Sequence, residues 1–292
     1  MYSFIKNNFY LFIAFFTVSW AIINNIPSNE RATTNTEYLF AKEDKNLITK
    51  QKNEINLRNL NRYRLNTKSS RNQSSSGTAF YLGNNLWMTA RHVINECKEV
   101  YLKNDNKNSF IEKILIHPNS DLALFSNNNL IPKKFEIGKE ISKIAFSSGY
   151  PAGNPGDVAL EFAGFMAMEA RSYNILEKHS IYAVLEKNPR NLLSFGGISG
   201  GPAFDSNGKI NGVVVAEFTR RGLLGVVGID QINWLLSASN NHSDFLNINS
   251  NTEFNLINLE INRKNYLKKG AELRRNKSIS KVICLAYYFV KL

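Results

Sequence analysis

Cysteine and histidine are both scarce in this sequence. Its 292 residues include only two cysteines, Cys97 and Cys284, and only four histidines. The cysteines do not form the paired C-x-x-C spacing of a structural zinc site, so we expect no structural metal. A disulfide between them would require an oxidising compartment, and the sequence leaves that bond open.

Acidic residues are outnumbered as well. The chain has 36 Lys and Arg residues against 24 Asp and Glu, which gives a formal net charge of +12. Residues 42–76 carry nine basic residues against three acidic ones, and residues 263–281 carry eight against one. These basic flanks suggest an anionic surface as a partner. No nucleic-acid-binding motif accompanies them, so nucleic acid is not expected as a partner.

No apolar run reaches the roughly 20 residues that a membrane-spanning helix requires. The run at residues 9–23 follows Lys6 and has the length of a signal-peptide core. Ser19 and Ala21 are small residues at the positions that a cleavage after Ala21 requires. We therefore predict a signal peptide or an uncleaved anchor in residues 1–26, and an exported protein that is periplasmic or secreted.

Long helical patterns and internal repeats are also missing. Residues 27–75 are rich in Asn, Lys, Thr and Ser, and we expect a basic, flexible lead-in there. From residue 76 onward, short apolar or alternating runs are separated by Asn, Gly and Lys turns. This pattern indicates an all-β barrel or sandwich rather than alternating strands and helices.

A Pro/Gly cluster at 151–156 divides the predicted strands into two sets. Farther on, the apolar spacing in 229–239 predicts a short closing helix. Residues 238–292 form an Asn-rich, basic tail. Its apolar stretch at 282–290 is too short to span a membrane, and it fits a strand or an interfacial patch.

One serine, Ser199, stands among four glycines and a proline in the stretch FGGISGGPAF, residues 195–204. Such a stretch can be a simple turn, or it can aim backbone N–H groups at a point beside the hydroxyl. A serine hydroxyl becomes a useful nucleophile only with a general base, normally a histidine held by a carboxylate. The stretch therefore indicates a catalytic serine only if a histidine and a carboxylate elsewhere in the chain can act with it.

Among the four histidines, His92 is the best candidate base because it follows an apolar strand in LWMTARHVI. The others lie in a turn before proline (His117), a polar loop (His179) and the tail (His242). Asp121 begins the apolar run of NSDLALF, where an acid is unexpected unless another group requires it.

The three residues occur in the signatures T-A-x-H (His92), D-L-A-L (Asp121) and G-x-S-G-G-P (Ser199). Together these resemble the chymotrypsin clan of trypsin-like serine proteases, most of all the HtrA/Deg type and other compact bacterial members, over roughly residues 76–237. The resemblance implies two six-stranded antiparallel β-barrels, at 76–155 and 156–237. It also implies a serine endopeptidase that acts on protein or peptide substrates and needs no cofactor.

The resemblance also implies a role for each residue. Ser199 would be the nucleophile, His92 the general base, and Asp121 the group that orients the imidazole. The amides of Gly197 and Ser199 would form the oxyanion hole, which explains the glycines around the serine.

Two departures from the resemblance stand out. Ile198 occupies the position where digestive members carry an Asp used in activation, so we infer no such switch. Only 55 residues follow Ser237, too few and too polar for the PDZ domain that HtrA/Deg proteins usually carry.

The resemblance places the pocket for the residue before the scissile bond between two walls. These walls are Leu193 and Ser194 on one side, and Val214, Val215 and Ala216 on the other. Neither offers a charged partner, which predicts cleavage after small or medium apolar residues. A shift of strand register by one residue would turn Glu217 inward and favour a basic residue instead.

Two alternatives to a peptidase also fit parts of the sequence. The stretch GISGG fits the G-x-S-x-G motif of esterases, but that fold needs the acid and the histidine after the serine. The non-enzyme alternative is a silent module of the trypsin-like fold that docks to an anionic surface through its basic flanks. The natural substrate and the oligomeric state are not predicted.

Overall fold

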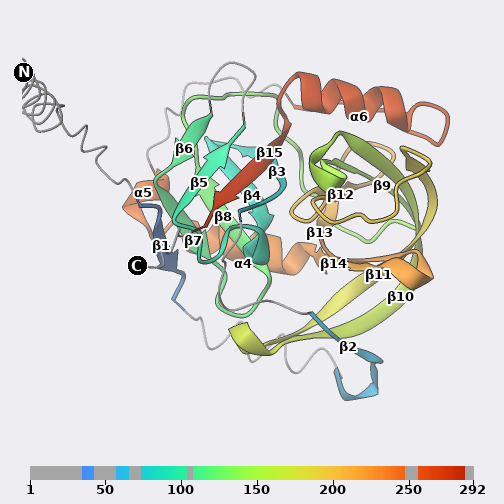
Figure 1. Ribbon diagram of the computed structural model, residues 1–292, viewed down its shortest axis with the longest axis horizontal. Coiled ribbons are helices and arrows are strands. Elements are labelled where there is room, and N and C mark those ends of the chain that lie inside the picture. The colour runs from blue at the N-terminus through green and yellow to red at the C-terminus, as the bar shows by residue number, and fades with distance from the viewer. Residues whose placement is uncertain (1–34, 43–56, 66–73, 104–107, 247–255, 287–292) are drawn as a thin grey trace, which may run out of the picture. The chain divides into compact units, whose positions relative to one another are not determined.

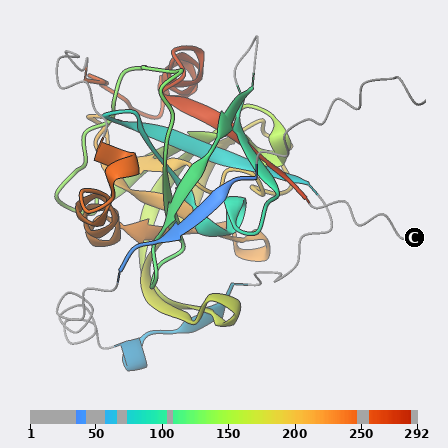
Figure 2. The same cartoon turned by 90° about the vertical axis from the view of Figure 1, so that its left-hand side faces the viewer.

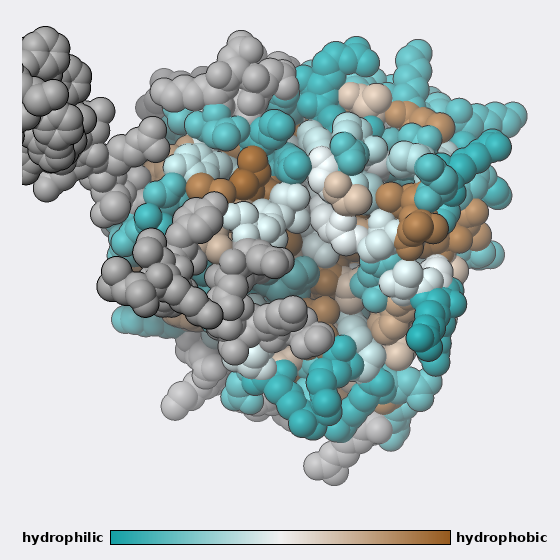
Figure 3. Space-filling model, in the orientation of Figure 1, coloured by the Kyte–Doolittle hydropathy of each residue, from teal (hydrophilic) through white to brown (hydrophobic). Residues whose placement is uncertain are grey.

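The computed structural model describes residues 35–42, 57–65, 74–103, 108–246 and 256–286, and β-strands are their main secondary structure. Every named strand in these ranges belongs to one of two sheets (Figure 1). Within these ranges, no helix is both long and apolar enough to cross a membrane. On the face shown in Figure 3, apolar residues gather only in small, separate patches.

The first sheet has eight strands in the order β1-β7-β8-β4-β3-β15-β5-β6. They are β1 (Glu37–Phe40), β3 (Ser75–Gly83), β4 (Leu86–Ala90), β5 (Glu99–Leu102), β6 (Ser109–Ile111), β7 (Lys113–Ile116), β8 (Leu122–Ser126) and β15 (Ile279–Leu285). The sheet curls around a core in which Trp87 stacks on Phe125 and contacts Tyr81. All five residues of β4 are buried, which explains its continuous apolar run rather than an alternating pattern.

The second sheet closes into a barrel of six strands, β9-β10-β11-β14-β13-β12, because β12 also pairs with β9 and β10 with β11. They are β9 (Ile144–Gly149), β10 (Gly156–Ala170), β11 (Ile175–Asn188), β12 (Pro202–Phe204), β13 (Ile210–Phe218) and β14 (Leu223–Gly228). A seventh strand, β2 (Arg62–Arg64), pairs in parallel with the far end of β10. The hairpin β10–β11 extends beyond the barrel, and its far end lies beside β2 in both ribbon views (Figures 1 and 2).

The helices are short and lie outside the sheets. They are α3 (Arg91–Ile94), α4 (Ile229–Ser239), α5 (Ser243–Leu246), α6 (Tyr266–Arg275) and four 3-10 turns, η1 (Leu57–Asn59), η2 (Pro151–Gly153), η3 (Arg171–Tyr173) and η4 (Thr219–Arg221). Helix α4 occupies the predicted range 229–239. The all-β, chymotrypsin-like fold class is confirmed, with one closed six-stranded barrel and one curled sheet.

The first sheet differs from the expected six antiparallel strands in its composition. Strand β1 comes from the segment predicted as a flexible lead-in, and it pairs in parallel with β7. Strand β15 comes from the predicted tail and lies between β3 and β5. Of the two alternatives for 282–290, residues up to Leu285 form a strand, and residues 287–292 lie outside the described ranges.

Part of the basic tail is used inside the fold. Arg274 of α6 is buried, and its guanidinium donates two hydrogen bonds to the Asp157 carboxylate at 2.6 and 2.8 Å. Arg263 pairs with Glu186 on β11. These basic residues are therefore engaged in holding the tail against the second barrel.

A disulfide joins Cys97, just after α3, to Cys284 on β15, with the Cα atoms 5.4 Å apart. The sequence left this bond open. It connects residues separated by 187 positions, and both cysteines are buried. The bond thus ties the tail strand to the segment that follows His92.

Reduction of this disulfide is expected to lower the free energy of unfolding by about 2–5 kcal/mol, because a long closed loop strongly restricts the unfolded chain. Urea unfolding with and without a phosphine reductant measures the change. The double variant Cys97→Ala/Cys284→Ala is the control and should not respond to reductant. An unchanged midpoint in the parent protein would contradict a stabilising role.

Candidate active site

His92 and Asp121 come together through the pairing of β4 with β8. The register places Ala90 opposite Leu122, so the residues just beyond these two positions are neighbours. Asp121 Oδ2 lies 2.6 Å from His92 Nδ1, and Asp121 Oδ1 accepts a 2.9 Å hydrogen bond from the His92 backbone N–H. Asp121 is completely buried, whereas 24% of the His92 side chain is exposed. The carboxylate thus holds the imidazole while the outer edge of the ring faces solvent.

Ser199 reaches the same region from the second barrel. Its carbonyl accepts a hydrogen bond from the Thr78 N–H of β3 at 2.9 Å. The next residue, Gly200, packs so closely that a Cβ there would lie 2.9 Å from the Ala90 N atom, two residues before His92. No hydrogen bond joins the Ser199 side chain to His92 in the described part of the chain. The loop therefore brings the serine backbone against the segment that carries His92.

Within the described ranges, the backbone around Ser199 leaves two N–H groups, those of Gly197 and Ser199, without hydrogen-bond partners. The Gly196 carbonyl accepts from the Ala152 N–H at 2.6 Å, and the Ile198 carbonyl accepts from the Gly201 N–H at 2.8 Å. Because N–H and C=O point in opposite directions across a trans peptide, the Gly197 and Ser199 amides point away from these contacts. Among the described residues, neither amide donates a hydrogen bond.

Gly197 has a backbone conformation that requires glycine. Its φ is +100°, and a Cβ at this position would lie 2.6 Å from the Tyr150 carbonyl oxygen. The loop at Tyr150–Gly153 thus holds the glycine turn from behind, with Thr78 Oγ1 donating to the Gly197 carbonyl at 2.8 Å.

Part of the chain is similar to a known protein family. Residues 77–213 match the family model described as the trypsin-like peptidase domain. Over this stretch, a little under half of its length, the chain is similar to that domain. No curated protein matches the chain.

Solved structures with a similar fold are serine proteases of low sequence identity. The active form of the Rv3671c protease from M. tuberculosis is 18% identical, with 58% of this chain and 82% of that chain covered and a TM-score of 0.48. The HtrA-type protease AlgW with a decapeptide is 16% identical, covering 56% and 51%, with a TM-score of 0.43. A serine endoprotease from Yersinia pestis is 16% identical, covering 55% and 56%, with a TM-score of 0.38.

The predicted pocket residues of the peptidase domain do not share one surface. Val214 packs in a cluster with Phe195 and Ile198, whereas Val215 and Ala216 belong to the main core cluster. An irregularity between Val214 and Ala216 in the pairing of β13 with β14 accompanies this split. Leu193 is 88% exposed.

Ser194 and Glu217 contact each other at this edge of the peptidase domain. The Ser194 hydroxyl donates a 2.8 Å hydrogen bond to Glu217 Oε2 and accepts one from the Gly196 N–H at 3.0 Å. The other Glu217 oxygen, Oε1, is buried and has no hydrogen-bond partner among the described residues. A carboxylate therefore lies against one of the walls predicted to be free of charge.

Sequence reasoning missed Glu177 and placed His179 in a polar loop. Both lie on β11 and are buried, with His179 at 0% and Glu177 at 5% exposure. Leu176, between Ile175 and Glu177, is 43% exposed, so here the polar residue faces inward and the apolar one outward. The inward positions of this strand mix the apolar Ile175 with the polar Glu177 and His179, so its period-two alternation gives no hydrophobic pattern.

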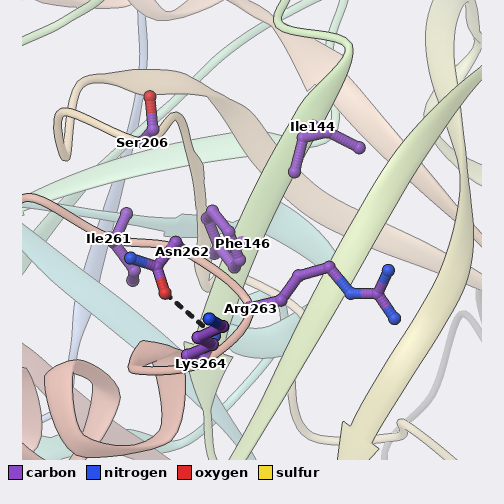
Figure 4. Close-up of a pocket in the computed structure, with 7 residues that line it drawn as sticks. All are labelled: Ile144, Phe146, Ser206, Ile261, Asn262, Arg263 and Lys264. Carbon is purple, nitrogen blue, oxygen red and sulfur yellow. Dashed lines mark hydrogen bonds between the residues drawn. The ribbon is translucent and has the colours of Figure 1, made fainter.

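A pocket of about 480 Å³ lies elsewhere, between β9 and the segment before α6 (Figure 4). It is lined by Ile144, Phe146, Ser206, Ile261, Asn262, Arg263 and Lys264. None of His92, Asp121 and Ser199 lines it, so it is separate from the candidate active site.

Proposed function

We propose that the protein is a serine endopeptidase in which Ser199, His92 and Asp121 act as a catalytic triad. The observation that carries the proposal is the double contact of the buried Asp121 carboxylate with His92, at 2.6 and 2.9 Å. The family match of residues 77–213 supports the reaction class.

In the proposed mechanism, Ser199 Oγ attacks the carbonyl carbon of the scissile peptide and transfers its proton to His92 Nε2. The negative oxygen that forms accepts hydrogen bonds from the Gly197 and Ser199 amides. His92 then protonates the leaving amine, the C–N bond breaks, and an acyl-enzyme remains. Water, deprotonated by His92, hydrolyses the ester and restores Ser199.

A fluorophosphonate probe tests this function directly. Such probes modify a serine only when a neighbouring base and an oxyanion site activate it. Covalent labelling at Ser199, detected by peptide mass spectrometry, would support the enzyme. A folded protein that never labels would instead indicate the silent binding module.

Replacing Gly197 with alanine is expected to lower kcat by roughly 10²–10³-fold, the usual effect of losing one oxyanion donor. The added Cβ would clash with the Tyr150 carbonyl, and φ at +100° is strained for alanine, so the turn must move. Gly222→Ala is a matched control, because it also has positive φ but lies in open space. Equal turnover of the parent and the Gly197→Ala variant would contradict an oxyanion role.

For the residue before the scissile bond, we propose a small or medium apolar side chain, because Val214, Phe195 and Ile198 form an apolar cluster beside the serine loop. One observation favours a second specificity. The Glu217 carboxylate lies 2.8 Å from the Ser194 hydroxyl, and a Lys or Arg side chain would pair with it.

Cleavage-site profiling on a denatured protein mixture distinguishes these two specificities. Dominant cleavage after Ala, Val or Leu is the expected result, and it should be unchanged in Glu217→Gln. Dominant cleavage after Lys or Arg that disappears in Glu217→Gln would assign the specificity to Glu217.

Export is also part of the proposal. The predicted signal in residues 1–26 lies outside the described residues. The Cys97–Cys284 disulfide supports export, because disulfides persist mainly in oxidising compartments. Mass spectrometry of the mature N-terminal peptide tests it, and a start near residue 22 is expected.

A further inference from the structure

Three polar side chains lie behind Asp121: Glu177 and His179, which are buried, and Tyr63, which is half-buried. Glu177 and His179 point to the same side of β11, two residues apart, where the hairpin leaves the second barrel: His179 pairs with Val227 of β14, and Glu177 lies just beyond this pairing. Tyr63 comes from β2 and lies opposite Met168 in the parallel pairing with β10. Figures 1 and 2 show β2 against this end of the hairpin.

The three side chains form a chain of contacts that ends at Asp121. The Asp121 backbone N–H donates a 3.1 Å hydrogen bond to Glu177 Oε1. His179 Nε2 lies 3.0 Å from the same oxygen, a close polar contact that is not aligned as a hydrogen bond. The Tyr63 hydroxyl lies 2.5 Å from His179 Nδ1.

The protonation state of the Tyr63 phenol decides which groups donate in these contacts. Burial raises the pKa of the Tyr63 phenol far above its ordinary value, and the nearby Glu177 and Asp121 charges add to this effect. The phenol therefore keeps its proton and donates a hydrogen bond to His179 Nδ1. The ring hydrogen of a neutral His179 then sits on Nε2, facing Glu177.

This cluster is costly if it serves only packing. It buries the Glu177 carboxylate close to that of Asp121, and like charges in a buried site repel each other. Glu177 Oε2 has no hydrogen-bond partner among the described residues. Apolar side chains would fill the same space at lower cost.

The other charged and titratable groups around Asp121 offset this cost only in part. Arg91 on α3 is buried, with its guanidinium 4.0 Å from the centre of the Tyr173 ring, and burial lowers its pKa. The pKa of His117, which precedes β8, is lowered to about 3 by burial, so that imidazole is neutral. His92 faces Asp121 from α3.

We propose that Glu177, held by His179 and Tyr63, is a positioning residue for the catalytic aspartate. It fixes the Asp121 backbone through the amide, and it adds a second negative charge behind the Asp121–His92 pair. Strand β2 of the lead-in completes the network by supplying Tyr63. The inference rests on the proposed peptidase function, in which the imidazolium of His92 forms during each acyl-transfer step.

The charge of Glu177 has a measurable consequence. A nearby negative charge favours the protonated imidazole, so its removal makes the imidazole lose its proton at lower pH. Glu177→Gln keeps an oxygen for the Asp121 N–H but removes the charge. We expect the acid limb of kcat/KM to move to lower pH by about 0.5–1 unit. Tyr63→Phe, which removes only the hydroxyl, should lower kcat by roughly 3–10-fold with KM unchanged.

The test uses the full chain and compares pH profiles of Glu177→Gln, Tyr63→Phe and the control Lys178→Gln. Lys178 is on the same strand and faces the ring of Phe165 on the other side. Thermal midpoints show whether each variant folds. The proposal is supported if the acid limb of kcat/KM shifts in Glu177→Gln and not in the control Lys178→Gln. It is overturned if the pH profile of Glu177→Gln coincides with that of the parent and only its thermal midpoint falls.

A second readout does not depend on turnover. In the Ser199→Ala background, the titration of His92 is followed by NMR of its ring C–H, with and without Glu177→Gln. A lower midpoint in the double variant supports the positioning role even if the chain proves to be no peptidase, and an equal midpoint refutes it. Failure of fluorophosphonate labelling in the parent would refute the proposed function alone.

Discussion

Replacing Ser199 with alanine is expected to reduce peptide hydrolysis to background, a loss of roughly 10⁴–10⁶-fold in kcat. The alanine has no group that can attack the carbonyl, so no acyl-enzyme forms. The fold should persist, because the Ser199 hydroxyl makes no hydrogen bond within the described residues and the loop is held by its backbone. The Ser199 carbonyl contact with Thr78 and the Gly200 N–H contact with Val214 both survive the substitution.

Hydrolysis of a quenched fluorescent protein substrate measures the loss, and the thermal midpoint confirms folding. Ser206→Ala is a suitable control, because Ser206 is exposed in the turn between β12 and β13 and lines only the distant pocket. Comparable turnover by the parent and the Ser199→Ala variant would refute the mechanism.

Asp121→Asn is expected to lower kcat on the order of 10⁴-fold at neutral pH, as in the general triad mechanism. The structure gives a specific reason. Oδ1 of Asp121 accepts from the His92 backbone N–H, which is always a donor. The single amide oxygen of asparagine must take that place, so its NH₂ group faces Nδ1. His92 then carries its hydrogen on Nε2, where it cannot accept the serine proton.

Single-turnover and steady-state kinetics at pH 7 measure this effect, with Asp230→Asn as the control for loss of one acid. Asp230 is exposed in the first turn of α4. A loss below about tenfold would mean that Asp121 is only a turn residue and that another acid orients His92.

The sequence by itself was sufficient for the fold class and for the recognition of the family. Short apolar runs with close turns predict an all-β fold, because strand periodicity is a local property. The stretches around His92, Asp121 and Ser199 are also local, since each describes a strand end or a tight turn. Their union as a triad stays a prediction, although the register of β4 against β8 places His92 on Asp121.

Only the tertiary structure decided which distant segments complete the sheets. Strand β15 comes from the tail and lies between β3 and β5, and the disulfide to Cys97 holds it there. Strands β1 and β2 come from the lead-in, and they pair in parallel with β7 and β10, respectively. Pairing between segments so far apart in the sequence depends on edges made available by the rest of the fold, and a strand as short as β2 carries little local signal of it.

The environments of Glu177, His179 and Glu217 were likewise decided in three dimensions. Glu177 and His179 read as part of a polar loop, yet the extended hairpin buries them behind Asp121. The irregularity in β13 accompanies the contact of Glu217 with Ser194. The burial and the electrostatic environment of a side chain depend on neighbours from several strands. These neighbours are distant in the sequence, so a local sequence pattern does not reveal them.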